Sequence, residues 1–201
     1  FYLVVCDADV SRAGGSFNPQ KSRIKYFAPN DWVQNRLKLY GVKKENIFLT
    51  GYPLPLENIG DEKMEIAKED LRNRILNLDI NKEYRTQYDS LIKRYIGKLP
   101  KKSNHILTLM FSIGGAGAQK EIVMEFLKSF KTRIKREQIR VILSAGTKEE
   151  VKKYFTESVK KLGLGRCQNI EIIYSENIND YFSKFNQALR HTDILWTKPS
   201  E

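Results

Sequence analysis

The chain has little cysteine and histidine, and it has no long apolar run. Its 201 residues include two cysteines, Cys6 and Cys167, which are far apart in the sequence and form no Cys-x-x-Cys motif. We therefore expect reduced thiols in a cytoplasmic protein and no disulfide framework. The two histidines, His105 and His191, lack the spacing of metal ligands, so we expect no metal cofactor. Because no run of about 18 apolar residues occurs, we predict no membrane-spanning helix.

Positive charge is in excess, with 35 Lys and Arg against 24 Asp and Glu and a net charge of +11. Such an excess is typical either of a solvated basic surface or of a protein with an anionic partner, such as nucleotide phosphates or an anionic membrane surface. The sequence has no aromatic-rich RNA-binding motif and no Cys/His finger, so we expect no nucleic-acid partner. Apolar residues make up 41% and charged residues 29%, which is a globular composition rather than a disordered one.

Both ends of the sequence lie inside patterns of secondary structure. The chain opens directly in an apolar run, residues 1–6, and stops shortly after a predicted strand at residues 193–196. We therefore expect a piece of a longer protein, with an incomplete domain at either end.

The first sixty residues have the pattern of a small α/β sheet. Three apolar segments predict strands, and the first of them reads as a buried parallel strand: residues 1–6, 24–28 and 47–50. A helix is predicted between the second and third strands, with Asn30 or Asp31 as its N-cap and Gly41 as its end.

The rest of the chain divides into a charged segment and a regular alternation. Residues 61–103 are helical in pattern and predict a connector, which ends at a Pro-Lys-Lys-Ser boundary. From residue 104 onward, strands alternate with helices: strands at 105–111, 139–143, 170–174 and 193–196, helices at 119–130, 148–162 and 178–189. This alternation predicts a doubly wound parallel sheet of the Rossmann type over residues 104–201.

A glycine-rich segment follows the first strand of this second sheet. It consists of Gly114, Gly115, Ala116, Gly117 and Ala118. Glycines allow a tight turn and the close approach of a phosphate, and the N-terminus of the next helix adds a favourable partial charge. The spacing matches neither GxGxxG nor a P-loop, so we expect a phosphate site of another kind or a turn needed only for packing.

Small and polar residues also follow the other strands of the second sheet, at the edge where open α/β sheets bind ligands. As residues that contact a nucleotide we predict Gly146, Thr147, Tyr174, Ser175, Asn177, Lys198, Ser200 and Glu201. Taken singly, each is also compatible with an ordinary connection between a strand and a helix.

Two carboxylates, Asp7 and Asp9, follow the first strand of the chain. A carboxylate at this position could act as general base on an acceptor hydroxyl. The alternative is a structural role, in which it caps the next segment or pairs with Arg12.

Four segments in a fixed order carry a family resemblance. They are the strand and helix at 24–42, the Ile-Phe-Leu-Thr-Gly-Tyr-Pro turn at 47–53, the glycine-rich loop at 114–118 and the strand with its end at 193–201. Together they resemble the GT-B family that contains the bacterial lipid-linked N-acetylglucosaminyltransferase of cell-wall synthesis and the plant-type monogalactosyldiacylglycerol synthases. In that comparison, residues 1–60 correspond to the end of the acceptor domain and residues 104–201 to the donor domain.

The resemblance implies a glycosyltransferase that moves a hexose from a UDP-linked nucleotide sugar to a lipid or other acceptor. It implies no bound metal, with Asp7 or Asp9 as the base and the donor as substrate rather than cofactor. It also implies a peripheral position on the cytoplasmic face of the inner membrane. Two alternatives stay open: a UDP-sugar 2-epimerase of the same fold, and a non-catalytic nucleotide-binding module.

Overall fold

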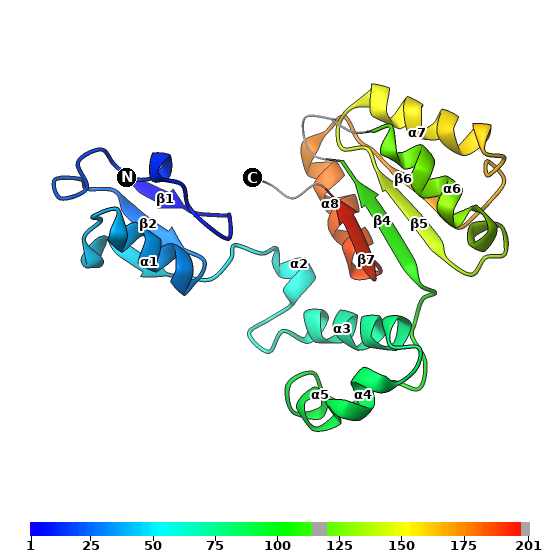
Figure 1. Cartoon of the computed structure of the whole chain (residues 1–201), viewed down its shortest axis with the longest axis horizontal. Helices are drawn as coiled ribbons and strands as arrows, with labels where there is room; N and C mark the ends of the chain where they lie inside the picture. Colours follow the sequence, from blue (N-terminus) through cyan, green and yellow to red (C-terminus); the bar gives the residue numbers. More distant parts are fainter. Residues whose placement is uncertain (114–119, 198–201) are drawn as a thin grey trace. The chain divides into compact units, whose positions relative to one another are not determined.

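The computed structural model describes residues 1–113 and 120–197, and the chain divides into two compact units, Phe1–Leu54 and Pro55–Glu201 (Figure 1). Each unit contains one sheet, and every strand pairing in both sheets is parallel. The predicted α/β class with parallel sheets is therefore confirmed. Among the described residues, no helix is both long and apolar enough to cross a membrane.

The first unit has a three-stranded sheet in the order β1-β2-β3, formed by β1 (Tyr2–Val4), β2 (Lys25–Ala28) and β3 (Ile47–Leu49). Helix α1 (Asp31–Leu39) joins β2 to β3, and short 3-10 turns lie at Arg12–Gly14 and Lys44–Asn46. The core packs one face of the sheet against α1, through fully buried side chains such as Tyr26, Val33 and Leu37.

Helix α1 begins and ends where the sequence predicts. The side chain of Asn30 accepts a hydrogen bond from the backbone N–H of Val33 at 2.8 Å, so Asn30, not Asp31, is the N-cap. Beyond the helix, Gly41 has a φ of 87°, a left-handed conformation that glycine adopts without strain.

The prediction of a buried first strand is wrong. β1 is the edge strand of its sheet, and Phe1, Tyr2 and Val4 are 94%, 71% and 52% exposed. The alternation along β1 turns only Leu3 toward the core, and the open face of the sheet carries an aromatic row in which Phe27 contacts Tyr2 and Phe48. The apolar run is continuous because both faces of β1 are apolar. Within this unit, only the face that carries Leu3 is covered by the core.

The second unit has a four-stranded sheet in the order β6-β5-β4-β7. Its strands are β4 (Thr108–Ser112), β5 (Arg140–Ser144), β6 (Ile170–Ile173) and β7 (Ile194–Thr197). In chain order this is third, second, first, fourth, which is the strand order of the Rossmann type. All four predicted strands occur, and β4 begins three residues later than expected.

Helices cover both faces of this sheet, which makes it doubly wound as predicted. On one face, α6 (Ile122–Lys135) and α7 (Glu149–Lys161) pack on alternate strand residues that include Leu109, Phe111 and Val141. On the other face, α8 (Ile178–Arg190) packs on Met110 and Ile142. Because side chains alternate along a strand, a continuous apolar strand such as β4 can bury both of its faces.

The charged helical segment, residues 61–103, lies within the second unit. A short helix, α2 (Leu56–Ile59), precedes it, and the segment itself contains α3 (Glu65–Leu78), α4 (Glu83–Gln87) and α5 (Asp89–Tyr95). Arg74 of α3 donates hydrogen bonds to the carbonyl oxygens of Thr192 at 2.8 Å and Leu189 at 2.7 Å, which lie at the turn between α8 and β7. These bonds hold α3 against the amino-terminal edge of the sheet.

The carboxylate of Asp193, whose side chain is fully buried, joins this edge together. One oxygen accepts hydrogen bonds from the backbone N–H of Thr108 at 2.8 Å and from the Asn77 amide at 3.0 Å. The other oxygen lies 3.3 Å from Nε2 of His105, and the Asp193 backbone N–H donates to the Thr108 carbonyl at 2.9 Å. A single residue thus fixes the start of β7 to the start of β4 and both to α3.

We expect Asp193→Ala to lower the free energy of unfolding by about 3 kcal/mol, because the Thr108 N–H and the Asn77 amide lose their acceptor inside the protein. Urea unfolding measures this change. Glu125→Ala is the matched control. Glu125 is an exposed helix carboxylate whose only ion pair with a described residue is to Lys128, so its loss should change stability by less than about 0.5 kcal/mol. Equal stability of the two variants would contradict the role of Asp193.

For Asp70 of α3 we expect the opposite effect on stability from that of Asp193. It is buried, 3.4 Å from Nη2 of Arg190, and burial raises the pKa of its carboxyl above the ordinary value of 3.8, although Arg190 opposes this. A raised pKa means that the native state binds the proton more tightly than the unfolded chain, so stability from this group is complete below 3.8 and is lost as the pH rises through the folded pKa.

We therefore expect Asp70→Asn to raise the free energy of unfolding at neutral pH, with an advantage that shrinks as the pH falls through the folded pKa and is gone below 3.8. Denaturant unfolding of both proteins across this pH range measures the difference. A variant that is less stable than the parent at neutral pH would show that the Arg190 ion pair outweighs the burial of the charge.

Candidate functional site

The strand order of the second sheet changes direction next to β4. From β4 the chain proceeds outward to β5 and β6, and α8 then returns it to β7 on the other side of β4. The connections on the two sides of β4 therefore leave a crevice outside the carboxyl ends of the strands, which is where open α/β sheets bind ligands.

A pocket of about 280 Å³ lies at this edge. It is lined by Ile113 directly after β4, by the loop after β5 and by the first two turns of α8: Ile113, Ala145, Gly146, Thr147, Lys148, Ile178, Tyr181 and Phe182. Its walls are mostly apolar, with a hydroxyl, an ammonium group and backbone amides at the loop. This combination is common in sites for small organic ligands.

The loop after β5 keeps its backbone open to the pocket. Gly146 has a φ of 66°, and a Cβ atom added there would meet nothing within 4 Å, so the conformation rather than crowding requires glycine. The backbone N–H of Ala145 donates to the Ile173 carbonyl at 2.9 Å, and that of Ser175 donates to the Gly146 carbonyl at 3.4 Å. The loop is thereby attached to the end of β6.

The wall from α8 is held by a side-chain hydrogen bond. The hydroxyl groups of Tyr181 and Ser144, the last residue of β5, are 2.8 Å apart. The Tyr181 ring also contacts those of Phe182 and Phe185, with centroids 5.4 and 5.7 Å away. Phe182 is half exposed, so an aromatic surface stays accessible at the pocket.

The structure brings together some of the predicted nucleotide contacts and not others. Gly146 and Thr147 line the pocket. Tyr174 packs on the α7 side of the sheet beneath Lys152, whose Nζ is 4.6 Å from the ring centroid. Ser175 accepts a hydrogen bond from the Asn177 N–H, and Asn177 is the N-cap of α8, accepting from the backbone N–H groups of Asn179 and Asp180.

The other predicted contacts lie outside the described residues. These are Gly114, Gly115, Ala116, Gly117, Ala118, Lys198, Ser200 and Glu201. The first group follows Ile113 directly in the chain, and Ile113 lines the pocket.

Sequence reasoning missed the apolar wall. Ile178, Tyr181 and Phe182 were predicted only as part of a helix. One signal in the sequence could have indicated this wall. Tyr181, Phe185 and Leu189 form the apolar stripe by which α8 packs on the sheet. Phe182 is a large apolar residue in the second turn of the helix but lies outside that stripe, so it is free to line a pocket.

In the first unit, Asp9 makes structural contacts. Its carboxylate accepts a hydrogen bond from the Val10 N–H at 2.7 Å and pairs with Arg36 of α1 at 2.9 Å. The alternative that named Arg12 as its partner is corrected by this geometry, because Arg12 instead donates to the Ser16 carbonyl and lies over the Tyr40 ring.

The contacts of Asp9 also affect its chemistry. The hydrogen bond from the Val10 N–H is the largest effect and lowers the pKa of the carboxyl. Burial raises the pKa by a smaller amount, and Arg36 and Trp32 lower it further. A carboxylate with a lowered pKa is a weaker base. Asp7 is exposed, and no hydrogen bond joins it to any residue that the structure describes.

Among residues 1–113 and 120–197, no group of three or more His, Cys, Asp and Glu residues is arranged to hold a metal ion.

A family described as a domain of unknown function, DUF6938, matches residues 80–171. No curated protein sequence matches the chain. Among solved structures, the chain is similar to UDP-GlcNAc 2-epimerase from Neisseria meningitidis bound to UDP-GlcNAc, with 12% identity and a TM-score of 0.42 over 87% of this chain.

It is also similar to HepE from Anabaena in complex with UDP and glucose, with 12% identity and a TM-score of 0.42 over 96% of this chain. The chain spans 38% of the length of the epimerase and 45% of that of HepE. The family resemblance drawn from the sequence stays a prediction.

The geometry of Asp9 predicts a pH-dependent contribution to stability. Because its folded pKa is lowered, the contribution is present above 3.8 and is lost as the pH falls through the folded value. We expect Asp9→Asn to increase the hydrogen exchange of the β1 and α1 amides at neutral pH, and to have no effect at a pH well below 3.8. Asp7→Asn is the matched control, and an equal effect of both substitutions would contradict the structural role of Asp9.

Proposed function

We propose that the second unit binds the nucleoside part of a nucleotide sugar in the pocket between β4, β5 and α8. The observation that carries this proposal is the coincidence of two independent features at one place. The strand order reverses beside β4, and the pocket opens at the carboxyl ends of β4 and β5. Ligands of open α/β sheets bind at such a reversal.

The size and lining of the pocket favour the nucleoside over the whole ligand. Its volume of about 280 Å³ is close to the lower end of the range of about 300–1,000 Å³ found for small-molecule sites. Ile178 and Phe182 offer apolar contact to a base, and Phe182 offers a ring for stacking. Thr147 and the backbone at Gly146 offer hydrogen-bonding groups to a ribose or a base edge.

The proposed position of the diphosphate comes from the sequence. The glycine-rich segment 114–118 directly follows Ile113, a residue of the pocket wall. Amides of such a segment at the start of a helix would stabilise negative charge on a diphosphate, including the charge that develops when the sugar leaves.

We further propose that the protein to which this chain belongs transfers the sugar, as the GT-B resemblance implies, with a UDP-linked donor and a lipid acceptor. Of the two carboxylates predicted as base, Asp7 is favoured. Asp9 is neutralised by Arg36 and has a lowered pKa, whereas Asp7 is exposed and has no partner among the described residues. Identification of the product, a glycoside or an epimerised sugar nucleotide, distinguishes this activity from that of an epimerase.

Isothermal titration of the chain with UDP, GDP, ADP and NAD tests the nucleotide site. We expect one nucleoside diphosphate to bind, and Phe182→Ala to weaken that binding about tenfold, since loss of a base–aromatic stack costs about 1–3 kcal/mol. Phe17→Ala is the matched control, because Phe17 is a fully exposed phenylalanine of the first unit. Its substitution should leave the affinity unchanged.

Two results would contradict the proposal. One is the absence of binding of all four nucleotides to a folded chain, as judged by circular dichroism. The other is binding that Phe182→Ala and Phe17→Ala change by the same factor, which would place the nucleotide elsewhere.

A further inference from the structure

A strongly basic surface lies away from the nucleotide pocket, on α4, α5 and the segment that follows them. Two adjoining hollows occur here, with volumes of about 540 and 550 Å³, and they share Lys98 and Leu99 in their walls. The first is lined by four cationic side chains and one acidic one, Asp89. The second is also lined by four cationic side chains and one acidic one, Glu69.

Four of the lysines around these hollows have no ionic partner among residues 1–113 and 120–197. Lys82, Lys98, Lys101 and Lys102 are exposed, and none forms an ion pair with any residue in the described part of the chain. Of the other three cations, Arg85 pairs with Asp79 at 3.1 Å and Lys93 pairs with Asp89 at 2.7 Å. Arg72 donates a hydrogen bond to the Ile96 carbonyl at 3.1 Å. Four ammonium groups without a described ion-pair partner therefore lie around two adjoining hollows.

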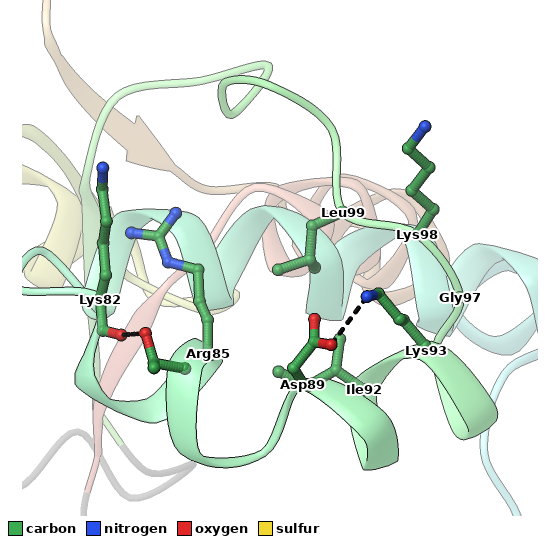
Figure 2. Close-up of a pocket in the computed structure, with 9 residues that line it drawn as sticks. Lys82, Arg85, Asp89, Ile92, Lys93, Gly97, Lys98 and Leu99 are labelled. Atoms are coloured by element: carbon green, nitrogen blue, oxygen red, sulfur yellow. Dashed lines mark hydrogen bonds and ion pairs between the residues drawn. The ribbon is translucent and has the colours of Figure 1, made fainter.

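Figure 2 shows how the side chains of the first hollow lie. Lys82, Arg85 and Lys98 extend to the same side of α4 and α5, and Lys93 turns back toward Asp89. Lys82 and Lys98 line the hollow from its two ends in this view, and Ile92 and Leu99 add apolar side chains to its lining.

The same helices also carry exposed aromatic and aliphatic side chains. Tyr84, Tyr88, Leu91 and Tyr95 are 49%, 36%, 49% and 61% exposed. The rings of Tyr84 and Tyr88 are 4.9 Å apart. Leu91 and Tyr95 are four residues apart within α5, so they lie on one face of that helix.

We propose that α4, α5 and residues 97–102 form a docking surface for an anionic membrane. The lysines would contact lipid phosphate groups, and the tyrosines and Leu91 would enter the interfacial layer. This proposal goes beyond the nucleotide site and does not depend on it.

The combination of side chains decides between a membrane and a soluble polyanion. A soluble phosphate compound needs cations alone and leaves the exposed Tyr84, Leu91 and Tyr95 without a function. The interface of a bilayer accommodates both kinds of group, because tyrosine has an apolar ring with a polar tip and basic residues are attracted to anionic headgroups.

Co-sedimentation of the chain with vesicles tests the proposal. The vesicles are either pure phosphatidylcholine or phosphatidylcholine with one third phosphatidylglycerol. We expect binding to the anionic vesicles only, weakened by added salt. The quadruple variant Lys82→Gln, Lys98→Gln, Lys101→Gln, Lys102→Gln should bind at least about 100-fold more weakly, since each basic residue near an anionic surface contributes about fivefold.

A second quadruple variant controls for net charge. Lys43→Gln, Lys44→Gln, Lys160→Gln, Lys161→Gln removes four exposed lysines that also have no ion pair with a described residue, so the total charge of the two variants is the same. We expect it to retain most of the binding. A double variant, Leu91→Gln with Tyr95→Gln, should lower vesicle binding about tenfold without changing the fold, because both side chains are exposed.

Three results would overturn the proposal. They are no binding to anionic vesicles by a folded chain, equal losses in the two quadruple variants, and displacement from vesicles by tripolyphosphate or a short RNA together with unchanged binding of the Leu91/Tyr95 variant. The last result would assign the surface to a soluble polyanion. The nucleotide affinity of each variant, measured in parallel, keeps the outcome separate from that of the nucleotide site.

Discussion

The buried carboxylate of Asp193 determines where β7 lies, and the position of β7 creates the reversal of strand order on which the candidate site depends. The hydrogen bonds of Asp193 to Thr108 and Asn77 join the starts of β7, β4 and α3 at the edge of the sheet opposite the pocket. A buried charge is tolerated only where its oxygens are satisfied, as they are here. These hydrogen bonds hold β4, β7 and α3 together at the amino-terminal edge of the sheet. The pocket lies at the opposite, carboxyl-terminal edge.

The two edges of this sheet consequently differ in how their polar groups are used. At the amino-terminal edge, Arg74 and Asn77 of α3 are occupied in fixing backbone carbonyls and a carboxylate. At the opposite edge, the glycine conformation at Gly146 and the half-exposed ring of Phe182 leave groups accessible. This division is usual for α/β proteins, in which binding residues lie on loops that a rigid scaffold positions.

The fold was largely predictable from the sequence, whereas the site was only partly so. The period of the apolar residues located all seven strands, and Asn30 marked the start of α1, because these signals are local. Local signals do not say what covers a strand, which is why the exposure of β1 was missed. They also do not say which charges meet: the pairing of Asp9 with Arg36, 27 residues away, follows from the packing of α1 on the sheet. Phe182 was missed for a similar reason, since its position at the mouth of a pocket is a property of three segments together.

The open face and free edge of the first sheet have a consequence for handling the chain in solution. Within the described residues, β1 pairs on one side only, and its other side presents backbone groups beside the exposed side chains of Tyr2 and Val4. An uncovered edge strand with apolar side chains is a template for strand addition by another molecule. The exposed Lys25, whose Nζ lies over the Phe48 ring, interrupts the apolar face with a positive charge. The colloidal behaviour of the isolated chain would then be governed by its first unit, with self-association increasing as salt screens the repulsion between its many lysines.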